Sequence, residues 1–282
     1  MSISRRSFLA TAGAVLSSAA AAKPSGDLHI GVTDWNLQQT GNLEAVALAK
    51  SLGFDGVQVS LGRKPVDNRL PLDNAEMQAQ YLRKARQEGI QLAGTCLDIL
   101  HVNYLKNDKL GQKWVADSIG ITKTLGAKVV LLPFFGRGAL TTHAEMDYVG
   151  DALKELAPEA EKADVILGLE DTISAEDNVR IMDRAGSKAV LVYYDVGNST
   201  NRGFDVVQEI RWLGKSRICQ MHLKDNPHLL GEGKIDFVSI MQAIHDIGFT
   251  GYANLETDAK SPASLEDDQR KNLAFLRKLL NG

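Results

Sequence analysis

The chain of 282 residues has only two cysteines and no long apolar segment. Cys96 and Cys219 both lie in apolar, strand-like runs, so we expect buried thiols more readily than a disulfide, although the sequence does not exclude a bridge. The apolar stretch at residues 8–22 is too short, and too rich in alanine and serine, to form a stable membrane span. What remains is a chain whose 44% hydrophobic residues can bury a substantial core.

Basic residues and glycine-rich turns are also missing where two common functions would need them. The formal charge is −3, and without residues 1–22 there are 30 basic against 35 acidic residues. A nucleic-acid binder normally shows the opposite balance or a dense basic patch, so no nucleic-acid partner is expected. The first strand-like run is followed by TDWNLQQTGN, which contains no G-x-G-x-x-G, and this disfavours a dinucleotide-binding fold.

The first residues have the pattern of an export signal. Residues 4–10, SRRSFLA, place Arg5 and Arg6 directly before the short apolar run, which ends in Ala20, Ala21 and Ala22 as an A-x-A-like cleavage site. This pattern resembles a twin-arginine signal. We therefore expect residues 1–22 to be a signal peptide, residues 23–282 to form the mature domain in the periplasm, and no stable membrane anchor to remain after cleavage. A disordered basic tail is the alternative.

Strand-like and helix-like runs alternate along the rest of the chain without a linker between them, which indicates a single α/β domain. The predicted strands are 28–33, 56–60, 91–97, 128–133, 165–170, 189–195, 218–224 and 252–256. The predicted helices are 43–52, 75–89, 110–126, 144–163, 174–186, 204–214, 236–248 and 265–280. Eight strands alternating with eight helices favour a (β/α)₈ TIM barrel over a doubly wound open sheet.

The last four predicted strands each carry a potential metal ligand at or near the end: Glu170, Asp195, His222 and Glu256. In a TIM barrel the C-terminal ends of the strands surround the active-site mouth, so these side chains could converge. Three carboxylates buried together would repel one another unless a cation lay between them. This oxygen-rich set suits Mn²⁺, Mg²⁺ or Co²⁺, and Zn²⁺ stays an alternative. Taken singly, each acid could instead be a helix N-cap or a solvated loop residue.

The motifs GLEDTISAEDN, YYDVGNS, MHLKD, LGEGKIDF and NLE resemble the xylose-isomerase-like TIM barrel superfamily, in particular its sugar isomerase/epimerase branch. The resemblance covers the whole predicted mature chain in strand and helix order. It implies that Glu170, Asp195, His222 and Glu256 bind one divalent metal ion. It also implies that Glu170 and Glu256 are the catalytic pair that removes and returns a proton next to a sugar carbonyl. Members often form dimers or tetramers, so a homo-oligomer is expected.

The substrate side of this resemblance is less complete. At the position of Asn198 the tagatose-epimerase type of this branch has a histidine, and in this respect the chain is closer to the phosphopentulose-epimerase type. At the position of His228 the tagatose type has an arginine. Glu176 matches a substrate-side position, although it could simply occupy the first turn of a helix. We predict substrate contacts for Glu176, Asn198, Lys224, His228 and Glu232. An exported protein would rarely meet phosphorylated sugars, which favours an unphosphorylated ketose or keto-sugar.

The stretch 218–237, ICQMHLKDNPHLLGEGKIDF, separates into three parts. By strand alternation, His222 and Lys224 share the inner face of the barrel. Asp225 is expected to orient the following loop, and Asp236 is expected to cap the next helix. Near the same mouth, three aromatic residues could stack on a sugar, although core packing is the simpler interpretation: Trp35, Phe134 and Phe135.

Three other functions compete with the epimerase or isomerase reading. An abasic-site DNA endonuclease of the same superfamily needs more histidines at strand ends than this chain has. A metal-dependent lyase or hydrolase of 3-keto-glycosides would begin with the same proton removal and then expel a substituent. A non-catalytic sugar-binding barrel would leave the four potential ligands without a role.

Overall fold

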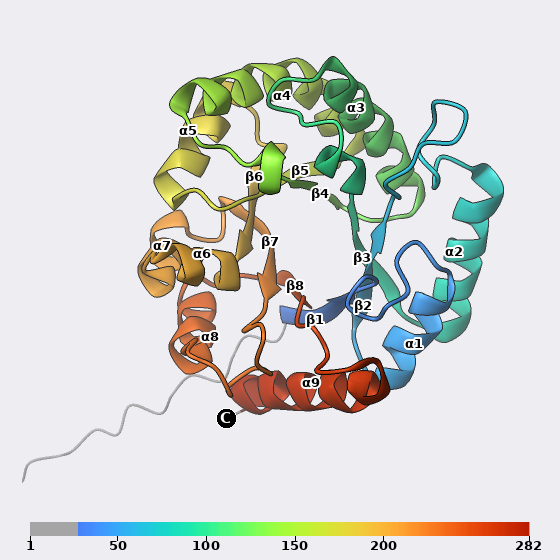
Figure 1. The fold of residues 1–282 in the computed structure, drawn as a ribbon, viewed down its shortest axis with the longest axis vertical. Coiled ribbons are helices and arrows are strands. Elements are labelled where there is room, and N and C mark those ends of the chain that lie inside the picture. The colour runs from blue at the N-terminus through green and yellow to red at the C-terminus, as the bar shows by residue number, and fades with distance from the viewer. Residues whose placement is uncertain (1–27, 282) are drawn as a thin grey trace, which may run out of the picture.

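The computed structural model describes residues 28–281, so the predicted signal peptide, with its two arginines, lies outside the described residues. Eight parallel strands form a closed barrel in which each strand pairs with its neighbours in sequence and β8 pairs with β1. Figure 1 shows this barrel inside a ring of helices. The strands are β1 (Leu28–Thr33), β2 (Gly56–Ser60), β3 (Gln91–Cys96), β4 (Val129–Pro133), β5 (Ile166–Glu170), β6 (Val190–Asp195), β7 (Ile218–Leu223) and β8 (Gly251–Leu255). The predicted (β/α)₈ barrel is therefore confirmed.

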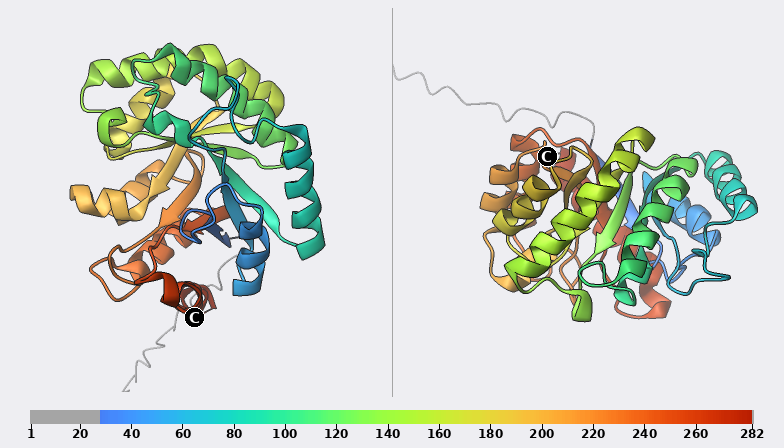
Figure 2. Two further views of the ribbon diagram at one scale, coloured as in Figure 1. Left: turned by 45° about the vertical axis from the view of Figure 1, so that its right-hand side comes forward. Right: turned by 90° about the horizontal axis from the view of Figure 1, so that it is seen from above.

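The helices of the described part connect these strands and cover the barrel from outside, as two further views also show (Figure 2). They are α1 (Glu44–Leu52), α2 (Ala75–Glu88), α3 (Lys109–Thr124), α4 (His143–Ala163), α5 (Ala175–Ala185), α6 (Val196–Arg202), α7 (Val206–Leu213), α8 (Phe237–Asp246) and α9 (Leu265–Asn281). Three short 3₁₀ helices are η1 (Asp98–His101), η2 (Gly136–Gly138) and η3 (Pro262–Ser264). Helix α9 packs against both α8 and α1, which closes the ring where the chain ends.

One helix was not predicted from the sequence. The sequence predicts a single helix, at 204–214, between β6 and β7. The segment between these two strands contains both α6 and α7. The sequence of α6, VGNSTNR, is short and polar and has no apolar periodicity. Its boundaries come from local chemistry: the Asp195 side chain accepts a hydrogen bond from the backbone N–H of Asn198, and Gly203 ends the helix in a left-handed conformation.

The strands are buried because helices cover one face and barrel-interior side chains cover the other. Apolar side chains fill the layer between strands and helices. The interior below the mouth is partly polar instead, with the buried amides Gln58, Gln220 and Asn254. Gly31 leaves the space that the Asn254 side chain occupies, since a Cβ at Gly31 would collide with that amide.

The predicted cap of the helix after β7 is confirmed. Asp236 caps α8 by accepting a hydrogen bond from the backbone N–H of Ser239. Both cysteines are free thiols in the structure, Cys96 buried and Cys219 half-buried. Within residues 28–281, no helix is both long enough and apolar enough to cross a membrane.

Candidate active site

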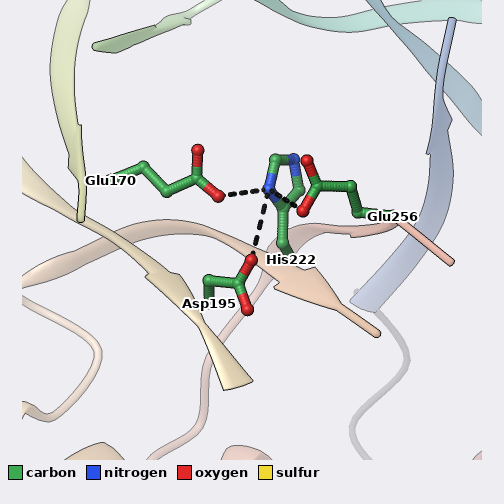
Figure 3. A group of neighbouring side chains, drawn as sticks. All are labelled: Glu170, Asp195, His222 and Glu256. Atoms are coloured by element: carbon green, nitrogen blue, oxygen red, sulfur yellow. Dashed lines mark hydrogen bonds and ion pairs between the residues drawn. The ribbon is translucent and has the colours of Figure 1, made fainter. Parts of the chain in front are cut away.

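The four predicted metal ligands come together at the C-terminal ends of β5 to β8 (Figure 3). Each offers a ligand atom, and these atoms all lie within 4.8 Å of one another: the residues are Glu170, Asp195, His222 and Glu256. Four residues spread over 87 positions of sequence therefore meet because consecutive parallel strands of a barrel end on the same side. In the described part of the chain, no other group of three or more acidic, histidine or cysteine side chains has the geometry to hold a metal ion.

The imidazole of His222 lies at the centre of this cluster. Its Nδ1 is 2.7 Å from Oε1 of Glu170, 3.4 Å from Oε2 of Glu256 and 3.8 Å from Oδ2 of Asp195. The His222 side chain is fully buried, and that of Glu256 is the most exposed of the four at 17%. The cluster is thus closed on the barrel side and accessible at Glu256.

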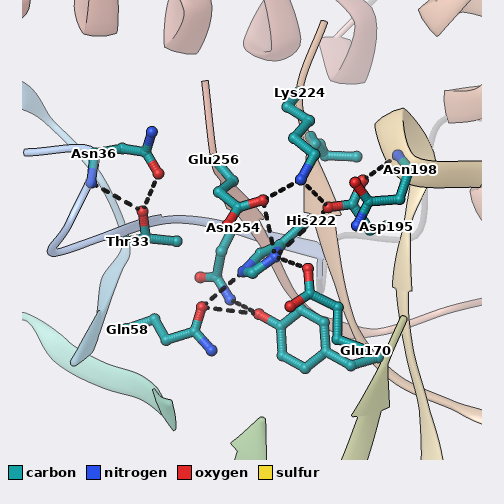
Figure 4. A network of polar contacts seen from close by, with 12 residues as sticks. Thr33, Asn36, Gln58, Glu170, Asp195, Asn198, His222, Lys224, Asn254 and Glu256 are labelled. Atoms are coloured by element: carbon teal, nitrogen blue, oxygen red, sulfur yellow. Dashed lines mark hydrogen bonds and ion pairs between the residues drawn. The ribbon is translucent and has the colours of Figure 1, made fainter. Parts of the chain in front are cut away.

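A buried hydrogen-bond chain defines which nitrogen of His222 is free. The Gln58 Oε1 atom lies 2.8 Å from His222 Nε2 and also accepts a hydrogen bond from the Tyr193 hydroxyl, which in turn accepts one from Asn254 (Figure 4). Since Gln58 presents an acceptor, His222 Nε2 must carry the proton. The lone pair of Nδ1 then faces the carboxylates, as it does in a histidine that binds metal through one nitrogen and is oriented through the other.

Asp195 serves two roles at once. Its Oδ1 caps α6 by accepting a 2.8 Å hydrogen bond from the backbone N–H of Asn198. Its Oδ2 is buried and has no hydrogen bond: the Nζ of Lys224 is 2.7 Å away, but without hydrogen-bond geometry. A buried carboxylate oxygen without a donor, beside two more carboxylates and a free imidazole lone pair, fits a bound divalent cation.

Lys224 and Trp35 hold the outer side of the cluster. The Lys224 ammonium lies 2.6 Å from Oε2 of Glu256, and the Trp35 indole N–H donates to Oε1 of the same carboxylate at 3.0 Å. Burial would lower the pKa of Lys224, but Asp195 and Glu256 outweigh it and raise that pKa above its ordinary value. Lys224 therefore stays charged beside the cluster.

The environment of the cluster shifts the pKa values of the two glutamates in opposite directions. Burial, reinforced by the charge of Glu256, raises the pKa of Glu170 well above its ordinary value. Burial would also raise the pKa of Glu256, but the Lys224 ammonium, which donates a hydrogen bond to it, holds that pKa below its ordinary value. Burial raises the pKa of Asp195 to about 7, against the effect of Lys224. Without a metal ion, Glu170 is thus the carboxyl group that holds a proton and Glu256 the one that holds negative charge.

A cavity of about 700 Å³, the mouth cavity, opens above the cluster. Glu170 and Glu256 form part of its floor, and the predicted substrate contacts Asn198 and Lys224 lie in its wall. Trp35 and Phe135 also line it, whereas Phe134 is buried in the core. The volume falls within the range of roughly 300–1,000 Å³ typical of small-molecule sites.

The other predicted substrate contacts lie elsewhere. His228 and Glu232 line a neighbouring cavity of about 510 Å³, the side cavity, which shares Lys224 with the mouth cavity. Glu176 is exposed in the first turn of α5 and lines neither cavity.

Several residues of the mouth were not predicted from the sequence. Gln58 was not predicted because its contact with His222 joins positions 164 residues apart and follows no periodicity. On the wall formed by the β2 and β3 ends, Asp98 is buried and accepts a hydrogen bond from the Ser60 hydroxyl, and the His101 ring stacks on Phe135. Ser60 ends β2 and Asp98 follows the end of β3 by two residues, and these strand-end positions were the signal that could have found them.

The chain is similar in sequence to known epimerases. The chain is 25% identical to 2-epi-5-epi-valiolone 7-phosphate 2-epimerase of Actinoplanes sp., over 73% of this chain and 78% of the relative. It is 27% identical to a putative L-ribulose-5-phosphate 3-epimerase of Escherichia coli, over 74% of this chain and 80% of the relative.

Two solved structures show the same fold at low identity. D-psicose 3-epimerase from Clostridium cellulolyticum, solved with D-tagatose, has a TM-score of 0.76 at 17% identity and covers 90% of this chain and 100% of its own. A 3-keto-D-glucoside 4-epimerase from E. coli has a TM-score of 0.72 at 18% identity and covers 89% of this chain and 98% of its own. The family model of the xylose isomerase-like TIM barrel matches residues 46–279, and the chain therefore belongs to this family.

Proposed function

We propose that this protein is a divalent-metal-dependent sugar epimerase or isomerase that acts on an unphosphorylated ketose or keto-sugar. The observation that carries the proposal is the convergence of Glu170, Asp195, His222 and Glu256 at the barrel mouth, where Glu170 and Glu256 line the mouth cavity. A divalent ion held by these residues would stabilise the negative charge that develops on the substrate oxygens. Mn²⁺ is our first choice for an oxygen-rich set with one imidazole.

The chain's own residues supply the proton transfers. Glu256, held as a carboxylate by Lys224 and Trp35, removes the proton from the carbon next to the carbonyl. Glu170, the second carboxyl group of the pair, returns a proton to the opposite face of that carbon. Return to the same carbon inverts it, and return to the neighbouring carbon moves the carbonyl.

The names of the relatives support this reaction class. The two relatives described above are named as epimerases of a cyclitol phosphate and a sugar phosphate, and the structural neighbours include epimerases named for free ketoses and for a 3-keto-glucoside. We propose that the chain is exported through its twin-arginine motif, and the periplasm offers free sugars rather than phosphorylated ones. This is why the free sugars, rather than the phosphates, define the substrate class that we propose.

Deuterium incorporation tests the proposal. The Mn²⁺-loaded full chain is incubated in D₂O with D-fructose, D-tagatose and 3-keto-glucosides, and ¹H NMR follows the proton next to the carbonyl. We expect exchange that ends when the metal is chelated, and at least a 100-fold slower exchange in Glu256→Gln, since general base catalysis contributes roughly 10²–10⁴-fold. No exchange with any sugar, or full exchange in Glu256→Gln, would contradict the proposed reaction.

Elimination from 3-keto-glycosides is the second candidate, because a second cavity next to the mouth gives room for a substituent on the sugar. It shares the proton removal with epimerisation and differs in the second step, since the substituent leaves instead of a proton returning. The same spectra separate the two reactions: elimination releases the free alcohol, and epimerisation keeps the glycosidic bond.

A further inference from the structure

The side cavity contains a carboxylate that nothing in the described structure neutralises. Asp225 is only 4% exposed and lines this cavity, and its Oδ2 is buried without a hydrogen bond. Of the two lysines that line the cavity, Lys224 pairs with Asp195 and Glu256, and Lys234 forms no ion pair with Asp225 among the described residues. A buried carboxylate accepts hydrogen bonds only, and leaving it without a donor is costly.

The loop holds Asp225 in this position. Its carboxyl group lies against Gly233, where any Cβ would collide with it, and an antiparallel bridge joins Asp225 to His228. The backbone N–H of His228 donates to the Asp225 carbonyl at 2.9 Å. The side chain is therefore placed by the backbone around it and not by polar partners of its own.

The chemistry of the cavity walls limits which chemical groups can bind to Asp225. Asp225 is not part of a metal-binding group in residues 28–281, because the cluster of Glu170, Asp195, His222 and Glu256 is the group found there. Lys224 and Lys234 on the walls disfavour an ammonium group. Neutral hydroxyl groups are the donors that remain, and a pair of adjacent hydroxyls can satisfy both oxygens of one carboxylate.

The side cavity lies next to the mouth cavity. Lys224 lines both cavities, and in Figure 4 its ammonium lies between Asp195 and Glu256. The stem of Lys224 passes over Gly197, which lines the side cavity from α6. A substrate whose carbonyl lies above the metal-binding cluster can therefore extend past Lys224 toward Asp225.

We propose that the side cavity is a subsite for a second polyhydroxylated unit of the substrate, and that Asp225 is its specificity-determining acceptor. The substrate class is then a ketose or keto-sugar joined to another sugar, rather than a free monosaccharide. This inference rests on the proposed function for the position of the reacting unit. It goes beyond that function because it assigns a site and a size to the rest of the substrate.

The test compares a monosaccharide with disaccharides. Isothermal titration of the Mn²⁺-loaded full chain measures the affinity for D-fructose and for the fructose-containing disaccharides lactulose, isomaltulose and turanose. We expect at least one disaccharide to bind ten or more times more tightly than fructose. In Asp225→Asn and Asp225→Ala this preference falls at least tenfold, because hydrogen bonds to a charged group are lost.

Two further variants serve as controls for the assignment of Asp225. Asn201→Trp fills the side cavity from α6 without changing Asp225, and it should also remove the preference. The matched control, Asp183→Asn, makes the same chemical change at an exposed position of α5 and should leave the preference as it is in the wild type. The melting temperature of Asp225→Asn should stay equal or rise, because an unsatisfied buried charge is removed.

Three outcomes would overturn the inference: no disaccharide preferred over fructose, a preference that survives in both Asp225 variants, or a melting temperature of Asp225→Asn lowered by several degrees. The last would show that Asp225 is a structural residue. Failure of the proposed function looks different, because deuterium exchange would then be absent from wild-type protein whatever the binding preference.

Discussion

At the residue scale, the site is built from side chains that have more than one role. Asp195 is both the N-cap of α6 and a member of the cluster that could hold a metal ion, so a strand-terminal acid can cap a helix and still face the barrel mouth. His222 is both a fully buried side chain and the source of an Nδ1 lone pair that faces the carboxylates. Neither residue could serve in the cluster without the partner that fixes its orientation, the α6 backbone for Asp195 and Gln58 for His222.

A second buried acid, Asp34, makes the stability of the protein depend on pH. Its Oδ2 accepts hydrogen bonds from the backbone N–H groups of Gly41 and Ser60, while its Oδ1 is buried without a partner. Burial raises the pKa of Asp34 from 3.8 to about 7. The folded state therefore binds the proton more tightly than the unfolded state, and stability falls as the pH rises from about 4 to about 7.

We predict that Asp34→Asn removes this loss, since the amide oxygen can still accept from both backbone groups. The gain in free energy of unfolding over wild type should be roughly 4 kcal/mol larger at pH 8 than at pH 4, because each pKa unit corresponds to about 1.4 kcal/mol. Urea unfolding at both pH values measures it, with Asp183→Asn as the exposed control. Parallel stability profiles for Asp34→Asn and wild type would show that this account of Asp34 is wrong.

At the element scale, α6 positions the lysine of the site. Gly197, in the first turn of α6, lies so close to Lys224 that a Cβ there would come within 2.5 Å of Lys224 Cγ and 3.1 Å of its backbone oxygen. The absence of a side chain at Gly197 is thus what lets the Lys224 stem cross α6 and reach Asp195 and Glu256.

We predict that Gly197→Ala displaces Lys224, lowers the free energy of unfolding by about 1–3 kcal/mol through overpacking, and slows deuterium exchange at least tenfold. Gly120→Ala is the matched control: Gly120 is in the middle of α3 with nothing within 4 Å of an added Cβ, and alanine should stabilise it by about 0.5–1 kcal/mol. Urea unfolding and the NMR exchange assay measure both effects. Wild-type stability and exchange in Gly197→Ala would refute this role of α6.

At the scale of the whole molecule, the barrel could be predicted from the sequence because its signals are local. Apolar runs such as residues 56–60 and 129–133 are buried strands, and their predicted ends differ from the observed ones by at most one residue. The convergence of Glu170, Asp195, His222 and Glu256 could be predicted too, because each lies at the end of its own strand in a repeating architecture.

The contacts that could not be predicted depend on three-dimensional packing. The link between Gln58 and His222 joins β2 to β7 across the barrel, and no sequence spacing encodes it. The division of the predicted substrate contacts between two cavities depends on how the loop after β7 folds over α6. Helix α6 is polar and has no apolar stripe that could reveal it in the sequence. Its ends are set by its two capping residues.

The central claim, that these four residues form one divalent-metal site, is tested most directly by calorimetric titration of Mn²⁺ into the chelator-treated full chain. The structure predicts one saturable site per chain, with affinity at least tenfold lower in Asp195→Asn because a charged carboxylate of the cluster is replaced by a neutral amide, and unchanged in Asp183→Asn. Absence of saturable binding, or wild-type affinity in Asp195→Asn, would contradict it.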